Sequence, residues 1–214
     1  MRLVIFGRQG AGKGTQSKLL AEHFNVPHIS TGDIFRAAIS AGTELGLAAK
    51  AIMDRGDLVP DDVLRGVVAE RLAEDDAAGG WLLDGFPRTP QQAEDLDEIA
   101  DPPLDVAINL DVPEDVVVER ISSRRVCEGE GHIYSAGDPS AESGICEIDG
   151  SPVTQRDDDT EDAVRHRLAL YSSQTEPLLE RYARADQLVT VDGVGDVETV
   201  LQRVIAAVEG RTNP

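Results

Sequence analysis

Five short runs along the chain have the pattern of β-strands, and each is followed by a longer segment with helical periodicity. The predicted strands lie at 3–6, 27–30, 81–84, 106–110 and 187–191. Strands that are apolar along most of their length are buried on both faces, as in a parallel sheet covered by helices. The pattern therefore predicts an α/β fold with a five-stranded parallel sheet.

Helices are expected between and after these strands, at 15–24, 31–40, 44–54, 61–74, 113–122, 159–185 and 196–209. A further helix should begin at Thr89 and Pro90, because Thr is a favoured N-cap and Pro a favoured first helical residue. Gln92 follows Thr89 by three positions, which completes a capping box.

One stretch interrupts the alternation of strands and helices. Residues 123–158 are rich in Gly, Ser, Asp and Glu and contain few large apolar side chains. A structureless loop of that length is unexpected inside a compact domain. The stretch is therefore predicted to be a small inserted subdomain of a single domain spanning residues 1–214.

The composition is that of a globular protein without a membrane anchor. The chain has 214 residues, 41% of them hydrophobic, which suffices for a buried core. It contains no run of about eighteen apolar residues, the minimum for a transmembrane helix. The first apolar run ends at Phe6, too early for a signal peptide. We therefore expect a cytoplasmic protein.

Charge excludes two classes of partner. The chain carries 40 acidic and 20 basic residues, a formal net charge of −20. Such a field repels the nucleic-acid backbone and anionic lipid, so neither is expected to bind. The acidic surface has two readings that stay open: adaptation to high salt, where self-repulsion is screened, or the composition of a GC-rich genome.

The first predicted strand leads into a phosphate loop. Residues 7–13 read Gly-Arg-Gln-Gly-Ala-Gly-Lys, which matches G-x-x-x-x-G-K between a strand and a helix. Backbone N–H groups of such a loop surround an anion, and the helix N-terminus adds its dipole. Lys13 supplies a point charge for phosphates, and the hydroxyl that usually reaches Mg²⁺ is carried by Thr15. The fold class is therefore that of a P-loop NTPase.

Further motifs follow in order along the chain. Residues 12–16 read Gly-Lys-Gly-Thr-Gln, 31–36 Thr-Gly-Asp-Ile-Phe-Arg, 56–60 Gly-Asp-Leu-Val-Pro, and 84–88 Asp-Gly-Phe-Pro-Arg. Arg124, Arg156 and Arg167 follow in and after the insert. As a set these motifs resemble the adenylate kinase family of nucleoside monophosphate kinases, in its long-lid form.

The resemblance implies transfer of a phosphoryl group from ATP to AMP with Mg²⁺, giving two ADP. It divides the chain into a core (1–29, 60–122 and 160–214), an AMP-binding segment (30–59) and a lid (123–159), with hinges near 122–123 and 157–159. A monomer is expected.

The resemblance also assigns site residues. The ATP side comprises Gly10, Ala11, Gly12, Lys13, Gly14, Thr15, Arg120, Arg124, Ile133, Tyr134 and Gly195. The AMP side comprises Thr31, Arg36, Asp57, Leu58, Val59, Gly85, Phe86, Pro87, Arg88, Gln92, Arg156 and Arg167. Lys13, Arg88, Arg124, Arg156 and Arg167 are the expected catalytic residues, and Asp84 with Thr15 the expected Mg²⁺ site. The loop departs from the family at Arg8 and Gln9, where Ala-Pro is common, and no role is assigned to Arg8.

The lid carries both cysteines of the chain. Many lids of this family hold zinc at four places, which here are Cys127, Glu130, Cys146 and Asp149. His132 is an alternative nitrogen ligand, since structural zinc sites prefer thiolate and imidazole. Three readings stay open: structural Zn²⁺, a metal-free polar network, or a disulfide.

Three other functions are weighed against this one. A UMP/CMP kinase is the nearest, but its usual short lid and Ala in place of Thr31 do not match. A GTPase needs an N-K-x-D motif, which the sequence lacks. A binding module without catalysis has no need for the arginine set.

Overall fold

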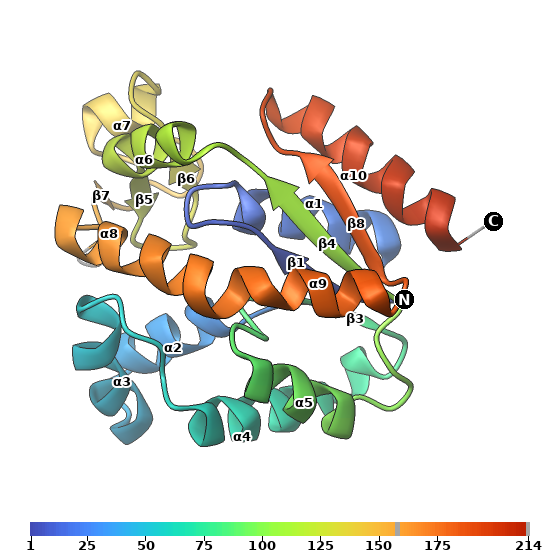
Figure 1. The fold of residues 1–214 in the computed structure, drawn as a ribbon. Helices are drawn as coiled ribbons and strands as arrows, with labels where there is room; N and C mark the ends of the chain where they lie inside the picture. The colour runs from blue at the N-terminus through green and yellow to red at the C-terminus, as the bar shows by residue number, and fades with distance from the viewer. Residues whose placement is uncertain (157–158, 213–214) are drawn as a thin grey trace.

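The computed structural model describes residues 1–156 and 159–212. Its centre is a parallel sheet of five strands in the order β2-β3-β1-β4-β8 (Figure 1). The strands are β1 (Arg2–Phe6), β2 (His28–Ser30), β3 (Trp81–Asp84), β4 (Val106–Asp111) and β8 (Leu188–Asp192). This confirms the predicted α/β fold and its five-stranded parallel sheet.

Both faces of the sheet are buried, as the apolar strands predict. In β1 the side chains of Leu3 and Ile5 join one apolar cluster with Leu20, whereas Val4 and Phe6 join a second cluster on the opposite face. All four are at most 2% exposed. Because successive side chains point to opposite faces of a strand, a continuously apolar strand requires a layer of helices on each side.

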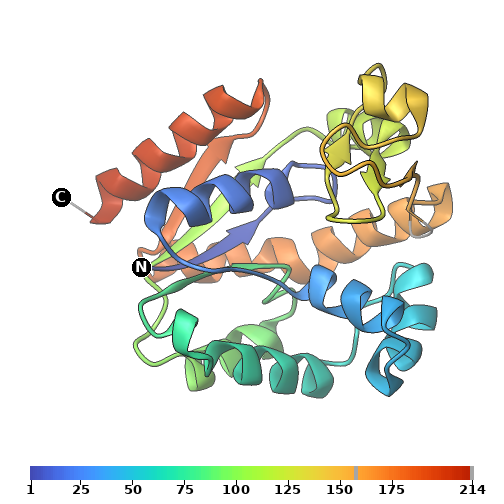
Figure 2. The ribbon, with the colours of Figure 1, turned by 180° about the vertical axis from the view of Figure 1, so that it is seen from behind.

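The helices supply these two layers (Figures 1 and 2). Helices α1 (Lys13–Phe24) and α10 (Val197–Thr212) cover one face, and α9 (Glu176–Arg184) lies across the other. The remaining long helices are α2 (Thr31–Ser40), α3 (Glu44–Asp54), α4 (Asp61–Leu72), α5 (Pro90–Ile99), α6 (Glu114–Ser123) and α8 (Glu161–Leu170). Helix α5 begins at the predicted residues, with Thr89 accepting a hydrogen bond from the Gln92 backbone and Pro90 at its first position. Only this half of the predicted capping box forms, because the Gln92 side chain accepts from the backbone N–H of Arg88 rather than that of Thr89.

The predicted insert is a small β-unit at the carboxyl edge of the main sheet. Its antiparallel strands β5 (Arg125–Cys127), β6 (Ile133–Tyr134) and β7 (Val153–Thr154) accompany one short helix, α7 (Pro139–Ser143). It has an apolar cluster of its own, formed by Cys127, Tyr134, Cys146 and Val153. The predicted hinge residues Asp157 and Asp158 lie outside the described residues.

The chain differs from expectation in the helix predicted at 159–185. It consists of α8 and α9 joined by a π-helical turn, Tyr171–Thr175. Pro177, the second residue of α9, has no N–H to donate to the preceding turn, so the regular hydrogen-bond ladder cannot continue there. A short 3₁₀ turn at Asp75–Ala77 was also not predicted. Within the described residues, no helix combines the length and the apolar character required to cross a membrane.

Candidate functional site

A cavity of about 490 Å³ opens at the carboxyl ends of β1 and β3. Residues from the phosphate loop, from segment 30–59 and from the lid all line it. Carboxyl ends of strands are where open parallel sheets bind ligands. The single cavity therefore brings together elements that lie more than a hundred residues apart in sequence.

Glycines shape the phosphate loop where no other residue fits. Gly10 has φ +82°, and a Cβ there would lie 2.8 Å from both Ile121 Cγ1 and the Val117 carbonyl oxygen. Gly12, the N-cap of α1, also has a left-handed conformation. Helix α1 begins directly afterwards at Lys13, so its N-terminal N–H groups face the cavity beside the loop. Such an arrangement of backbone N–H groups can bind an anion.

The side chain of Lys13 folds back against the backbone of the phosphate loop. Its Nζ donates to the carbonyls of Gly7 at 2.7 Å and Arg8 at 3.1 Å. Burial, together with the positive charges of Arg88 and Arg124, lowers the pKa of Lys13 to about 8 against the opposing effect of Asp84. An incoming phosphate would add negative charge beside the ammonium.

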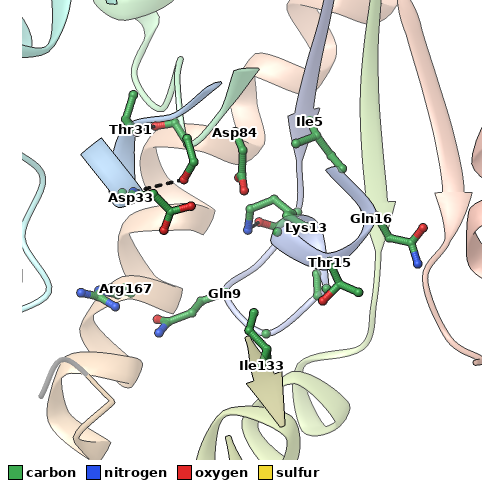
Figure 3. A pocket seen from close by; sticks show the side chains of 18 of the residues that line it. Ile5, Gln9, Lys13, Thr15, Gln16, Thr31, Asp33, Asp84, Ile133 and Arg167 are labelled. Atoms are coloured by element: carbon green, nitrogen blue, oxygen red, sulfur yellow. Dashed lines mark hydrogen bonds between the residues drawn. The ribbon is translucent and has the colours of Figure 1, made fainter. Parts of the chain in front are cut away.

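Asp84 ends β3 and faces the same cavity as Thr15 and Lys13 (Figure 3). Burial by itself raises the pKa of Asp84, but the neighbouring His28, Lys13 and Arg88 keep it below its usual value. The side chain is 12% exposed and lies 3.7 Å from His28 Nε2. An ionised carboxylate and a hydroxyl that line one cavity are hard oxygen donors of the kind that Mg²⁺ prefers.

A second group of predicted residues surrounds Gly85. Thr31 Oγ1 donates to the Gly85 carbonyl at 3.1 Å, and Arg88 Nε donates to the same oxygen at 2.7 Å. Gly85 has φ +89°, and a Cβ there would lie 2.7 Å from Thr31 Oγ1 and 2.8 Å from Arg88 Nη2. Thr175, in the π-helical turn, donates to the Arg88 carbonyl at 2.9 Å. These bonds hold Arg88 at the cavity wall.

The helical segment 30–59 forms the adjoining wall. Arg36, Asp57, Leu58 and Val59 all line the cavity. Arg36 Nη2 lies 2.5 Å from Asp33 Oδ1, one turn earlier in α2. The wall therefore combines apolar surface with a cation, as a site for an aromatic base carrying a phosphate requires.

On the opposite side, Arg120 reaches back over the phosphate loop. Its guanidinium donates to the carbonyls of Ala11 at 3.5 Å and Gly193 at 3.4 Å. Gly195, in the turn between β8 and α10, lines the cavity near it. Ile133 and Tyr134 of β6 line the cavity from the lid side.

The remaining predicted arginines converge on the cavity from the base of the lid. Arg124 forms a two-armed ion pair with Asp159, with Nε donating to Oδ2 at 2.8 Å and Nη2 donating to Oδ1. Arg156 and Arg167 line the cavity as well. Arg167 Nη2 donates to the Met53 carbonyl at 3.0 Å, which connects α8 to segment 30–59.

Two of the predicted contact residues do not line the cavity. Phe86 is 1% exposed and belongs to the apolar core. Gln92 is 0% exposed, and both ends of its amide are bonded: Oε1 accepts from the Arg88 backbone at 2.7 Å and Nε2 donates to Asp61 Oδ1 at 2.6 Å. In the observed arrangement Gln92 supports Arg88 from behind the cavity wall. Direct contact of Phe86 or Gln92 with a ligand stays a prediction.

The lid cluster differs from the predicted ligand set in one member. Donor atoms of Cys127, His132, Cys146 and Asp149 all lie within 4.8 Å of one another. The side chain of Glu130, which the prediction included, is 74% exposed and pairs with the far side of His132 at 3.7 Å. His132, the alternative ligand, takes its place. Both cysteines are free thiols.

The spacing of these atoms suits a tetrahedral ion. Cys127 Sγ lies 3.1 Å from Asp149 Oδ2, Cys146 Sγ 3.4 Å from His132 Nδ1, and that nitrogen 3.5 Å from Asp149 Oδ2. Zinc bond lengths place tetrahedral ligand atoms about 3.3–3.8 Å apart, so the two distances to His132 fall within this range and the Cys127–Asp149 distance is slightly shorter. Two thiols, an imidazole and a carboxylate therefore fit Zn²⁺. The same atoms also form a hydrogen-bonded network, in which Tyr134 Oη lies 3.1 Å from Cys146 Sγ.

Gln9, Tyr171 and Thr175 are among the cavity-lining residues that sequence reasoning missed. Gln9 extends from the phosphate loop into the cavity, and Tyr171 and Thr175 line the cavity from the π-helical turn. Pro177 was the available signal for that turn, since it interrupts an otherwise helical pattern. Arg8, whose role was not assigned, turns away toward Tyr171, with its guanidinium carbon 5.7 Å from the ring centre. It also lies 3.6 Å from Glu176 and 3.9 Å from Asp111.

Comparison with known proteins assigns a family to this arrangement. A family model described as adenylate kinase matches residues 5–187. A protein of Oceanobacillus iheyensis named adenylate kinase is 50% identical over 213 residues, covering 98% of this chain and 99% of its own length. The corresponding proteins of Methanosarcina mazei (48% identity, 96% and 97% coverage) and Streptomyces avermitilis (47%, 98% and 97%) carry the same name.

Proposed function

This chain belongs to the adenylate kinase family, and we propose that its cavity holds ATP and AMP in line and transfers a phosphoryl group between them to give two ADP. The chain is a phosphotransferase, as are its named relatives. The observation that carries the proposal is the convergence of Lys13, Arg88, Arg124, Arg156 and Arg167 on one cavity. The acidic surface elsewhere makes this local gathering of cations distinctive.

The ATP side is formed by the phosphate loop and by the residues that cover it. Backbone N–H groups of residues 10–15 and the Lys13 ammonium bind the phosphates. The Arg120 guanidinium, which rests on the Ala11 and Gly193 carbonyls, offers a flat surface for the adenine ring. Gly195, Ile133 and Tyr134 complete the wall around the base and ribose.

The AMP side is formed by segment 30–59 and the turn after β3. Arg36 and Arg88 bind the α-phosphate through planar guanidinium groups, which match a phosphate in bidentate geometry. Thr31, Gly85 and Pro87 line the same wall, and Asp57, Leu58 and Val59 enclose the base. Gln92 contacts adenine directly if its amide releases Asp61 and hydrogen-bonds the adenine ring. Otherwise it acts by holding Arg88 in place.

Transfer needs positioning and positive charge rather than a general base, because the acceptor phosphate is already an anion. Arg88, Arg124, Arg156 and Arg167 surround the region between the two nucleotides, where the transferring group spreads negative charge over its oxygens. Thr15 and Asp84 would hold Mg²⁺, which would supply further charge neutralisation at the ATP phosphates.

The lid (123–159) and the AMP-binding segment (30–59) act as small units on a rigid core. Lid residues line the nucleotide cavity, so the lid excludes water from the transfer site when it closes. We infer that Cys127, His132, Cys146 and Asp149 hold a structural Zn²⁺ that stiffens the lid, because two thiols and an imidazole are preferred zinc ligands.

The surroundings in which the enzyme works follow from charge and chemistry. A net charge of −20 disfavours nucleic acid and anionic membranes as partners, which leaves ATP, AMP and ADP. Two reduced thiols in the lid are compatible with the cytoplasm. We infer a cytoplasmic monomer, since one chain supplies both nucleotide sides of the cavity.

A coupled assay tests the proposal. ADP formation is measured from ATP plus AMP, from ATP plus UMP, and from ATP alone, each with Mg²⁺. Turnover with AMP at least about a hundredfold above UMP is expected, because Thr31 and the long lid match the AMP-specific members. Turnover with UMP but not with AMP would instead support the UMP/CMP kinase alternative, which the named relatives do not favour.

A further inference from the structure

Gln9 connects the phosphate loop to the base of the lid. Its Nε2 donates to Asp159 Oδ1 at 3.1 Å, across 150 residues of sequence. Figure 3 shows the side chain leaving the loop on the side away from Gln16, toward the helix that carries Arg167. Reversing the amide would bring its oxygen against the Asp159 carboxylate. The chemistry therefore sets the orientation of the amide.

Asp159 is the centre of this contact. Its side chain is fully buried, and it binds Arg124 through both carboxylate oxygens. Arg124 precedes β5 at the start of the lid, and Asp159 stands at its end. The ion pair therefore closes the base of the lid, and Gln9 fastens that closed base to the phosphate loop.

The free-energy cost of burying the Gln9 amide indicates that this side chain does more than fill space. Gln9 Oε1 is buried and accepts no hydrogen bond within the described residues. A buried acceptor without a partner costs about 1–3 kcal/mol, which an apolar side chain of the same shape would avoid. Hydrogen bonds to ionised groups are stronger than those between neutral groups. Within the Gln9 side chain, only the amide N–H₂ can donate such a bond to the Asp159 carboxylate.

We propose that Gln9 is a positioning residue for phosphoryl transfer: through Asp159 it holds the Arg124 guanidinium against the phosphates bound by the loop. The inference rests on the proposed role of Arg124. Arg8 adds a second contact between the loop and the helical stretch that follows Asp159, at Tyr171 and Glu176.

The first test replaces Gln9 by an isosteric side chain without a donor. For Gln9→Met we expect kcat/KM for ATP to fall about tenfold, the effect of losing one hydrogen bond to a charged group. KM for AMP at saturating ATP should stay within twofold, and the melting temperature within about 2 °C. An equal rise in KM for both nucleotides, or wild-type kinetics, would overturn the inference.

The second test separates the hydrogen bond from the volume of the side chain. In Gln9→Glu the new carboxyl faces Asp159, and two carboxylates that share a site titrate with one raised pKa. When protonated, Glu donates to Asp159 as Gln does; when ionised, it repels Asp159 and competes for Arg124. The ratio of variant to wild-type kcat/KM should therefore rise as the pH falls from 8 to 5.5, whereas the ratio for Gln9→Met stays flat. A flat ratio for Gln9→Glu would refute the proposal.

A double-mutant cycle identifies Asp159 as the intermediary. In an Asp159→Ala background, Gln9→Met should change kcat/KM for ATP by less than twofold, because the residue on which Gln9 acts is gone. Effects that multiply would mean that Gln9 acts independently of Asp159. If Asp159→Ala does not fold, the pH ratio of Gln9→Glu decides alone. A wild-type enzyme that forms no ADP from ATP and AMP would instead refute the proposed function, and the two failures are thereby distinguished.

Discussion

Lys13 gives the most quantitative prediction, because its environment favours the neutral amine. Burial, with help from Arg88 and Arg124, lowers its pKa from an ordinary value near 10.5 to about 8. That difference corresponds to roughly 3 kcal/mol between the charged and neutral forms. The hydrogen bonds to the Gly7 and Arg8 carbonyls keep the ammonium in place despite this cost.

The stability consequence has a definite sign. Between pH 8 and pH 10.5 the unfolded chain holds the Lys13 proton more tightly than the folded chain does, so folding becomes more favourable as the pH rises. Below pH 8 both states are protonated and the cost of the buried charge is present in full. Relative to Lys13→Met, the wild-type free energy of unfolding should therefore rise by about 3 kcal/mol from pH 8 to pH 10.5. Urea denaturation of both proteins at matched pH measures this difference.

Activity should move in the opposite direction. Only the ammonium form neutralises the ATP phosphates, so kcat/KM for ATP should fall above pH 8, about tenfold by pH 9. Lys13→Arg is the matched control, because a guanidinium stays protonated throughout this range and the decline should vanish whatever its absolute activity. A stability difference independent of pH, or the same decline in Lys13→Arg, would refute the reasoning.

Three further predictions follow from single contacts. Arg88→Ala should lower kcat/KM on the order of 10²-fold or more, as the loss of a transition-state charge contact does, whereas the control Arg165→Ala, whose side chain is 75% exposed, should stay within twofold of wild type by the same assay. Gly10→Ala should unfold at lower urea concentration and bind ATP weakly by calorimetry, because its Cβ would lie 2.8 Å from Ile121 Cγ1; an unchanged midpoint would contradict the close packing. Purified protein should carry about one Zn²⁺ per chain, lost in Cys146→Ser, and chelation should lower its melting temperature; no metal together with an unaffected melting temperature would favour the polar network.

The strands, the phosphate loop and the family motifs could all be predicted from the sequence. Continuous apolar character marks a doubly covered strand, as Leu3, Val4, Ile5 and Phe6 illustrate by burying on both faces. The Thr89–Pro90–Gln92 start of α5 is equally local, because a cap depends on residues within one turn. Such features depend on residues close to one another in the sequence, so they could be predicted without the tertiary structure.

Contacts between distant residues required the tertiary structure. The choice of His132 over Glu130 in the lid cluster depends on the folding of the turn that joins β5 to β6, because both residues lie in that turn. The place of Gln92 behind Arg88 depends on Asp61, thirty-one residues away. Gln9 likewise looked like an ordinary variation in the loop. Its bond to Asp159 is formed only when the lid base folds against the loop, a long-range contact that no local pattern in the sequence encodes.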